Sequence, residues 1–485
     1  MSKGSYVRVF PSQIKARHKT IAAALGTAGN PLRTAIIGSG PAGFYTAEHL
    51  LKQDDIHVRV DMFDALPTPF GLVRFGVAPD HQKIKSVTRV FDRIAQRDNF
   101  RFFGDVTIGE HLTLDDLTTH FHQVCFATGA QTDRRMGIPD EDLPRSHPAT
   151  EFVAWFNGHP DYRNYEFDLS AEHVAVVGVG NVAVDVARIL CRTPEELATT
   201  DIADHALEAL SESNVRTVTM LGVRGPAQAA FTNPEVRELG ELEGADICVF
   251  SDEVKLDALS QAEVEESDDD KVARKVEILQ EFAQQERQGK ERLLTLRFLV
   301  SPTKLIAGED GGVRAMQLVK NELCMDDGRL RPRATEEVEE IPVDLVFRSV
   351  GYRGIPIEGL PFHDSWGIIP NSAGQVTEVQ SGTPRTGIYV SGWIKRGPTG
   401  VIGTNKKDGT ETATAMLEDA RSSAVLVPKY SDPDAIEALV RERQPQVGTY
   451  EDWMRLDKLE VSRGEDRGRP RVKLTSRTEV REALK

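Results

Sequence analysis

Three glycines near the start of the chain have the spacing of a dinucleotide-binding turn. Gly38, Gly40 and Gly43 stand in the order G-x-G-x-x-G. In this pattern the first glycine permits a tight turn, the second lets a pyrophosphate approach the backbone, and the third lets a helix pack on its strand. Asp64 lies 21 positions beyond Gly43, where an acidic residue accepts hydrogen bonds from ribose hydroxyls. The pattern predicts a first dinucleotide site.

A second copy of this turn begins at Gly178. Gly180 takes the second position and Ala183 replaces the third glycine, a replacement that the motif tolerates. The strand expected after it ends close to Arg224, a cation where an acidic residue would contact a free 2′-hydroxyl. Such a cation accommodates the 2′-phosphate of NADP. The alternative is a solvated arginine at a strand end, but its place after a dinucleotide turn favours the phosphate interpretation.

These turns need a buried strand before them and a helix after them. Short apolar runs and helical spacing supply both. We expect strands at 34–37, 58–63, 173–177, 215–221 and 387–393, and helices at 44–52 and 184–190. Dense glycines after the last of these strands, up to Asn405, imply close approach of the backbone to a ligand.

The two dinucleotide sites differ in charge, with an acidic residue at the ribose position of the first and a basic residue at that of the second. Such a pair of sites suggests electron transfer between two cofactors. Nicotinamide and flavin carry out the hydride chemistry themselves, so the protein only has to position them. This explains why neither a nucleophile–base triad nor paired carboxylates are evident. The four cysteines form no C-x-x-C, which removes the usual ligands of zinc and of an iron–sulfur cluster, and the pair of a dithiol centre.

The composition limits the remaining function classes. The 485 residues are 40% hydrophobic and 28% charged, with a net charge of −16. This suits a globular protein of several domains, and the acidic balance excludes a general nucleic-acid binder. No apolar stretch is long enough to span a bilayer. The separated cysteines fit a reducing compartment, so we expect a cytoplasmic protein.

Residues 1–47 contain no Asp or Glu. Such a leader is either an organelle transit peptide, which would place the protein in the mitochondrial matrix, or an extension ahead of the first strand. We favour the extension.

Five sequence blocks, quoted by number, carry a family resemblance: 38–43, 66–81, 180–188, 224–232 and 392–405. With these blocks the chain resembles the adrenodoxin-reductase-type ferredoxin–NADP reductases, and the bacterial branch more than the mitochondrial one. The resemblance implies an α/β protein of two Rossmann-like (doubly wound) domains, with the NADP-binding domain inserted into the FAD-binding domain. It divides the chain into an extension (1–31), the first part of the FAD domain (32–132), the NADP domain (133–350), and the second FAD part with the C-terminal tail (351–485).

The resemblance also implies site residues. FAD contacts beyond the first glycine turn and Asp64 are Ala42, Leu72, Val106, Trp393, Gly400, Val401 and Ile402. NADP contacts beyond the second turn and Arg224 are Asn181, Val182, Ala183, Val184, Arg134 and Glu235, and Gly400 would touch both cofactors. His81 and Glu238 stand where the family has a catalytic pair that tunes hydride transfer. By itself a lone histidine in a loop is more often hydrogen-bonded to backbone than catalytic.

One departure from the family concerns the 2′-phosphate. The family has paired arginines, whereas this chain reads Val223-Arg224. Losing one charge-assisted contact removes about 1.5–3 kcal/mol, so we expect weaker discrimination between NADP(H) and NAD(H) than in a paired-arginine relative. A preference of many thousandfold would contradict this hypothesis.

The resulting mechanism has two steps. NADPH transfers hydride to FAD, and the reduced flavin passes single electrons to a ferredoxin-type iron–sulfur protein, a sequence that is reversible in principle.

Because ferredoxins are acidic, a chain with a net charge of −16 needs a local basic patch for this partner. The run 271–297 supplies seven cations, although a salt-bridged, solvated helix is the more ordinary interpretation. We expect a monomer or a weak oligomer.

Other proteins with two dinucleotide turns are alternatives. A thioredoxin-reductase-like enzyme needs a dithiol and a glutamate-synthase-type subunit needs an N-terminal cysteine cluster, and the sequence has neither. A flavin-dependent diaphorase or monooxygenase with another acceptor, or a redox-inactive dinucleotide-binding regulator, would be distinguished by its products or by a colourless protein.

Overall fold

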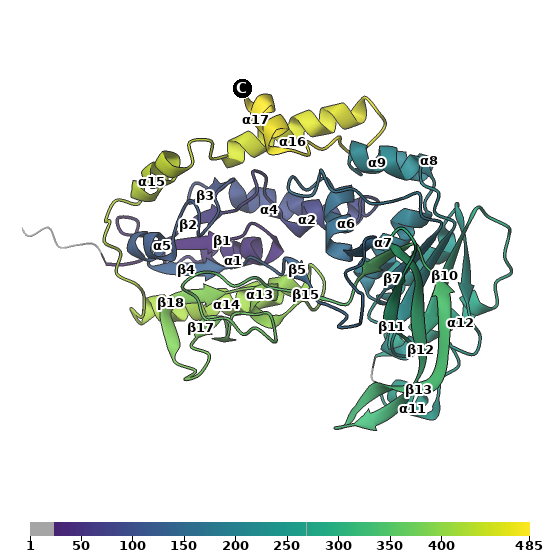
Figure 1. The fold of residues 1–485 in the computed structure, drawn as a ribbon. Coiled ribbons are helices and arrows are strands. Elements are labelled where there is room, and N and C mark those ends of the chain that lie inside the picture. The colour runs from purple at the N-terminus through teal and green to yellow at the C-terminus, as the bar shows by residue number, and fades with distance from the viewer. Residues whose placement is uncertain (1–23, 268) are drawn as a thin grey trace, which may run out of the picture.

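The computed structural model describes residues 24–267 and 269–485, and two parallel sheets organise this part of the chain (Figure 1). The predicted extension at 1–31 lies largely outside the described residues, and so does the choice between transit peptide and extension. Residues 24–31 form a tight turn in which the Gly26 N–H donates to Asn30 O at 2.8 Å. No helix of the described residues is long and apolar enough to cross a membrane.

The first sheet has seven strands and is built from both ends of the chain. Its order is β16-β17-β18-β4-β1-β2-β3. The strands are β1 (Leu32–Ile37), β2 (Val58–Phe63), β3 (Phe100–Phe103), β4 (Gln123–Phe126), β16 (Asn371–Ser372), β17 (Gln375–Thr377) and β18 (Pro384–Val390). All pairs from β18 to β3 are parallel. All six β1 residues are buried, as expected for a parallel strand covered on both faces.

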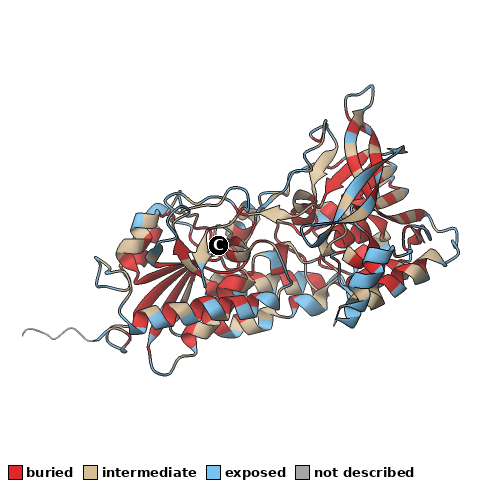
Figure 2. Ribbon diagram, turned by 90° about the horizontal axis from the view of Figure 1, so that it is seen from below, coloured by how far each residue is buried: buried red, intermediate tan, exposed pale blue. Residues whose placement is uncertain are grey.

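Helices cover both faces of this sheet, so its strands lie buried between helices with exposed outer sides (Figure 2). One apolar cluster joins the sheet to α1 (Pro41–Leu51), α4 (Thr88–Ala95), α14 (Thr404–Arg421) and α16 (Tyr450–Glu465). The opposite face packs on α5 (Leu114–His120) and α15 (Ala435–Arg443). Short helices α2 (Leu72–Phe75) and α3 (Gln82–Lys85) lead from this half toward the second sheet.

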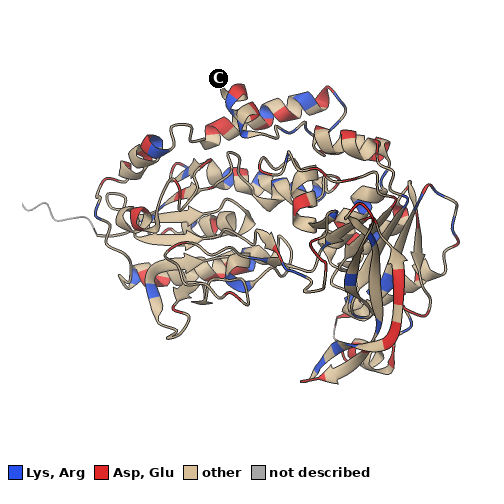
Figure 3. Ribbon diagram, in the orientation of Figure 1, with Lys and Arg blue, Asp and Glu red and all other residues tan. Residues whose placement is uncertain are grey.

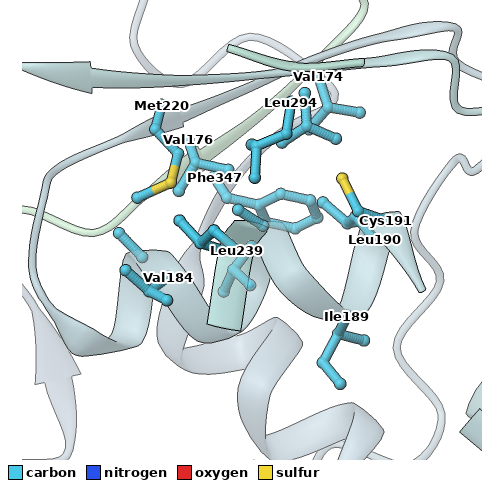
Figure 4. Packing of buried hydrophobic residues seen from close by; sticks show 14 of the residues in the cluster. Val174, Val176, Val184, Ile189, Leu190, Cys191, Met220, Leu239, Leu294 and Phe347 are labelled. Carbon is cyan, nitrogen blue, oxygen red and sulfur yellow. The ribbon is translucent and has the colours of Figure 1, made fainter. Parts of the chain in front are cut away.

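The second sheet has six parallel strands in the order β6-β14-β7-β8-β10-β9. They are β6 (Ser146–Pro148), β7 (His173–Val177), β8 (Thr217–Gly222), β9 (Ala245–Val249), β10 (Arg292–Phe298) and β14 (Leu345–Arg348). One face packs on α6 (Ala149–Phe156), α7 (Asn181–Cys191), α8 (Pro194–Ala198), α9 (Asp204–Ser211), α10 (Asn233–Glu238) and α12 (Asp270–Ala283). Figure 4 shows Val176 and Phe347 of the strands facing Val184 and Leu190 of α7.

A three-stranded antiparallel sheet covers the other face of the second sheet. Its strands are β11 (Val300–Ala307), β12 (Val313–Asp326) and β13 (Arg329–Pro342), and the sequence analysis predicted none of them. The last two form a long hairpin that extends beyond the body of the protein beside α11 (Ala258–Glu265) (Figure 1).

Two short strands join the halves where the chain passes between them. Antiparallel β5 (Thr132–Asp133) and β15 (Tyr352–Arg353) pair Tyr352 with Asp133. The predicted boundaries at 132/133 and 350/351 fall beside this pair, although the division into domains stays a prediction.

The C-terminal segment forms a further link between the halves. Helices α16 and α17 (Arg477–Leu484) lie across the top of the view in Figure 1, and basic and acidic residues alternate along them (Figure 3). Trp453 packs edge-on against Phe70 of the first half. Lys473 reaches Asp201 of the second half, which also binds Lys85 at 2.6 Å. The tail is therefore part of the packed structure.

The predicted strands and helices exist; the strands at 58–63 and 173–177 have the expected bounds, and the other elements have shifted ends. Both helices after the glycine turns begin three residues earlier than expected, at Pro41 and Asn181, directly after the glycine that serves as N-cap. The strand expected at 215–221 is Thr217–Gly222. The one expected at 387–393 is Pro384–Val390, because Gly392 has a φ of 80° and starts the short helix α13 (Trp393–Arg396).

Candidate functional site

The first glycine turn leaves an open cradle at the start of α1. Gly38 has a φ of 106°, which favours glycine. A Cβ on Gly43 would lie 2.1 Å from Gly38 O, so the helix packs on its strand only with glycine there. A Cβ on Gly40 would meet no described atom within 4 Å. No side chain of the described residues caps α1, so its first N–H groups face this open space, as an anion-binding helix end requires.

The second turn repeats this geometry at the start of α7. Gly178 has a φ of 135°, and a Cβ there would lie 2.3 Å from Ser349 O. Gly180 again borders open space within the described structure, where an added Cβ would have no neighbour inside 4 Å. Ala183 is completely buried in the helix–sheet core, which explains why a methyl group is accepted at the third position. Asn181 Oδ1 accepts from Thr232 N at 2.9 Å, so this side chain fixes the loop before α10.

Asp64 lies at the end of β2 and faces the first turn. Its Oδ2 accepts from the Ser39 N–H at 2.7 Å and from Ser39 Oγ at 2.5 Å, and its Oδ1 accepts from the Leu66 N–H at 2.9 Å. Burial raises the pKa of Asp64 above its ordinary value, against the opposing effect of these hydrogen bonds. The carboxylate thus supports the turn itself, a role that the ribose prediction did not include.

The other predicted FAD contacts converge on the same turn from distant parts of the sequence. A Cβ on Gly71 would lie 3.1 Å from Gly40 Cα, which places neighbouring Leu72 beside the cradle. A Cβ on Gly392 would lie 2.5 Å from the Ala42 Cβ, which brings the segment 392–402 to α1. Val106 is buried, and its N–H donates to Asp64 O at 2.8 Å.

Exposed apolar side chains border this region. Leu72 is 45% exposed and Val401 is 54% exposed. Trp393 stacks on Tyr352 with ring centroids 5.5 Å apart, and its Nε1 donates to Thr399 O at 3.2 Å. An apolar ring system bound here would cover these side chains.

His81 and Glu238 meet across the two halves. His81 precedes α3 in the first half and Glu238 ends α10 in the second, and His81 Nε2 lies 2.9 Å from Glu238 Oε2. Glu235 Oε2 is 3.7 Å from the same nitrogen. The structure therefore brings together three predicted site residues, although His81 lies more than 150 positions before the two glutamates in the sequence.

A completely buried arginine supports this contact, and the sequence analysis did not single it out. Arg188 of α7 donates to Asp80 at 2.8 and 3.1 Å and to Asp185 at 2.7 Å. Its Nη1 lies 3.1 Å from Glu238 Oε2. Arg188 thus binds both Asp80, which precedes His81, and Glu238, which His81 contacts. A basic residue on the buried face of a helix that follows a dinucleotide turn was the available signal.

The charges of this cluster shift the pKa values of its members. Burial would lower the pKa of His81, but the hydrogen bond with Glu238 and the charges of Asp185 and Asp80 together raise it above its ordinary value. Burial would raise the pKa of Glu238, whereas His81 and Arg188 bring it below its ordinary value. Burial raises the pKa of Asp185 to about 7. The contact therefore favours the charged forms of both His81 and Glu238.

His81, Glu235 and Glu238 also have the donor atoms of a metal site, with ligand atoms all within 4.8 Å of one another. The Arg188 guanidinium already lies 3.1 and 3.5 Å from the two carboxylates, so it supplies the positive charge that a metal would bring. We assign no metal to this cluster.

The predicted 2′-phosphate residue lies on the surface after β8. Arg224 is exposed, and its Nη2 is 3.5 Å from Gln228 O. Arg134 is also exposed and donates to the carbonyls of Tyr352 and Trp366 at 3.3 Å. Neither guanidinium has a carboxylate partner among the described residues, so both are available to an anion.

The run 271–297 does not form a basic patch. Arg292 is buried and donates to Val215 O, Arg274 pairs with Glu277 and Glu281, and Arg297 pairs with Glu253 and Glu339. Arg274 and Arg297 fit the interpretation as a salt-bridged face, whereas Arg292 belongs to the interior of the fold.

The comparisons with known proteins agree with this geometry. A family model described as pyridine nucleotide-disulphide oxidoreductase matches residues 32–225. NADPH-ferredoxin reductase FprA of Mycobacterium tuberculosis is 44% identical over 465 residues, which are 93% of this chain and 98% of the relative. The mitochondrial NADPH:adrenodoxin oxidoreductase of Salvelinus fontinalis is 38% identical over 455 residues, covering 91% and 89%. The chain belongs to the adrenodoxin-reductase family of NADPH–ferredoxin reductases.

The solved structures extend this family likeness to the fold. A structure of Mycobacterium tuberculosis FprA in complex with NADPH has a TM-score of 0.88 and 43% sequence identity, over 94% of this chain and 100% of that one. The two-sheet α/β fold expected from the resemblance is therefore confirmed. The family model is named for disulphide chemistry, but all four cysteines here are free and two of them are buried.

Proposed function

We propose that this protein takes two electrons from NADPH and delivers them singly to a ferredoxin-type iron–sulfur protein, with FAD as its bound carrier. Membership of the NADPH–ferredoxin reductases supports the activity. The observation that carries it is the pairing of two open dinucleotide turns with a His81–Glu238 contact between the halves that hold them. Bound FAD supplies the chemistry, because it accepts a hydride and gives up electrons one at a time.

The first half fits FAD. Gly40 leaves room for a pyrophosphate, and the uncapped start of α1 offers it N–H groups and the positive end of the helix dipole. Asp64 holds the turn through Ser39. Ala42, Leu72, Val106, Trp393 and the segment Gly400 to Ile402 would hold the remaining parts of FAD.

The second half fits NADP(H) in the same way. Gly180 and the start of α7, residues Asn181 to Val184, would bind the pyrophosphate. Arg224 would bind the 2′-phosphate, supported by its exposure and free guanidinium. Arg134, at the crossing between the halves, and Glu235, beside His81, would contact the rest of NADP(H).

His81 and Glu238 would orient the two reacting rings. The pair joins the halves at 2.9 Å, and the raised pKa of His81 favours the protonated imidazole. Arg188 fixes the partners of His81. These residues would hold the reacting rings in register and keep positive charge at their edge.

Electron transfer to a ferredoxin tests this function. The FAD-loaded protein is mixed with NADPH and cytochrome c, with and without a ferredoxin. We expect cytochrome c reduction to depend on the ferredoxin and to follow NADPH consumption. NADPH consumption that does not depend on the ferredoxin and that yields hydrogen peroxide would instead indicate an oxidase or diaphorase.

A further inference from the structure

The loop that carries Arg224 follows a strand of the second sheet, but residues outside that sheet bind it. Arg224 follows β8, and its side chain has one weak contact among the described residues, to Gln228 O at 3.5 Å. The direction of the guanidinium therefore depends on the backbone that carries it. The loop that carries Arg224 is short, because Gly225 leads directly into the 3-10 turn Pro226–Gln228.

A buried side chain of the three-stranded sheet binds this backbone. Asn321 of β12 is 4% exposed. Its Nδ2 donates to Val223 O at 2.9 Å and to Ser301 Oγ at 2.8 Å. The amide thus connects the loop before Arg224 to β11.

A second contact holds the other side of Arg224. The Leu299 N–H donates to Arg224 O at 3.1 Å, and Leu299 O accepts from the Asn321 N–H at 2.7 Å. The carbonyls of both Val223 and Arg224 are thus bonded to a unit made of Asn321 and Leu299.

Two local irregularities make this unit. Leu299 has a φ of 57°, an uncommon conformation for a residue with a branched side chain. The pairing of β12 with β13 shifts register between Val319 and Asn321. Such bulges redirect a side chain away from the regular ladder, and here the side chain reaches the Arg224 loop.

The sequence of the loop makes this support important. Where relatives have paired arginines, this chain has Val223, so a single guanidinium must recognise the 2′-phosphate. A bidentate charge-assisted contact requires that guanidinium in a fixed position. Asn321 supplies a fixed point one residue before it.

We propose that Asn321 is a positioning residue for cofactor specificity: it holds the Val223–Arg224 backbone so that Arg224 can bind the 2′-phosphate that distinguishes NADPH from NADH. This inference rests on the proposed function, in particular on Arg224 as the phosphate ligand. It assigns to the sheet β11–β13 a part in the choice of cofactor.

The test compares NADPH with NADH in one variant. Asn321 would affect only the contact between Arg224 and the 2′-phosphate. Asn321→Ala should therefore raise KM for NADPH and lower kcat/KM by about 5- to 30-fold, the effect of one lost buried hydrogen bond. The value for NADH should change less than about twofold. If Asn321→Ala does not fold, Asn321→Asp keeps the shape and removes the donor, and the same selective loss is expected.

Two further variants separate positioning from general stability. Ser301→Ala removes the other partner of the same amide and should leave both cofactors unaffected. In an Arg224→Met background, Asn321→Ala should cause no further loss with NADPH, because its route to the phosphate is already gone. The proposal would be overturned if Asn321→Ala lowered kcat/KM equally for both cofactors or left the NADPH kinetics unchanged. It would also be overturned if the losses of Asn321→Ala and Arg224→Met added in the double variant.

The wild-type protein distinguishes failure of this inference from failure of the proposed function. A protein that neither cofactor reduces contradicts the proposed function. A protein reduced equally by both contradicts Arg224 as phosphate ligand and overturns this inference with it. A wild-type preference for NADPH that Asn321→Ala preserves overturns the inference alone.

Discussion

His81 Nε2 lies 2.9 Å from Glu238 Oε2, although His81 precedes α3 in the first half of the fold and Glu238 ends α10 in the second. Their contact joins the two halves that carry the dinucleotide turns. Behind it, Arg188 holds both Asp80 and Glu238. In the proposed function, the relative position of the two cofactors would depend on these buried charges as well as on the two turns.

The two open glycines should separate cofactor binding from folding. Gly40→Ala meets no described atom within 4 Å, so the protein should fold normally but bind FAD at least tenfold more weakly, about 1.4 kcal/mol. Gly180→Ala should do the same for NADPH and leave FAD in place. Isothermal titration and the flavin content after gel filtration measure both effects.

Gly43→Ala is the matched control for these variants. Its Cβ would lie 2.1 Å from a backbone oxygen, so it should lower the free energy of unfolding by about 2 kcal/mol or more. A Gly40→Ala protein that keeps wild-type FAD affinity would contradict the assigned cradle.

The contact between His81 and Glu238 should give the stability a specific pH dependence. The raised pKa of His81 means that its contribution is complete below the ordinary value of 6.5 and disappears as the pH rises through the raised pKa. The lowered pKa of Glu238 means that its contribution is present above 4.5 and disappears as the pH falls through the lowered value.

Urea unfolding of wild type and His81→Gln tests this dependence. The difference in free energy of unfolding should be largest between the ordinary pKa values of 4.5 and 6.5 and should decrease as the pH rises through the raised pKa of His81. Glu238→Gln should show the same profile, and the double variant should add little. A difference that is constant with pH would show that the pair is not ionised in the folded protein.

Arg188 should be the most important cation of the junction for stability. Its side chain is completely buried and faces four carboxylates, so Arg188→Met leaves buried charges unpaired and should cost about 3–5 kcal/mol. Arg192→Met removes a more exposed partner of the same Asp80 and should cost about 1 kcal/mol or less. Chemical denaturation of both variants checks the order, and equal losses would contradict it.

A second arginine should strengthen the preference for NADPH. Val223→Arg restores the paired arrangement of the family and should raise the ratio of NADH to NADPH dissociation constants by about 10- to 100-fold, the effect of one charge-assisted contact. Competition with 2′,5′-ADP measures the same contact without the nicotinamide. A change below threefold would show that Val223 does not limit recognition.

Local sequence patterns were sufficient for the two turns and their strands. Gly38, Gly40 and Gly43 predict their own geometry because each position has its own steric requirement, and Ala183 fits because a methyl group packs in the core. The two-sheet fold followed from the family resemblance. The ends of helices were less accurate, since proline and asparagine directly after the N-cap glycines already belong to the helices.

Contacts between distant segments could not be predicted in the same way. Lys473 looks like an ordinary surface cation in the sequence, yet it is buried and binds Asp201. The helix pattern could place Arg188 on a buried face, but it could not identify Asp80, 108 positions away, as its partner. Asn321 acquires its role through a bulge, which has no sequence signature. In the run 271–297 the sequence left a basic patch open beside the more ordinary salt-bridged face, and only the fold shows which carboxylates and carbonyls bind Arg274, Arg292 and Arg297.

An anaerobic absorbance spectrum of the FAD-loaded protein, recorded before and after NADPH and separately NADH, tests the central claim most directly. The account predicts that NADPH bleaches the flavin bands within seconds and that NADH does so more slowly. A yellow protein whose bands neither nucleotide changes, or a protein that retains no flavin, would contradict it.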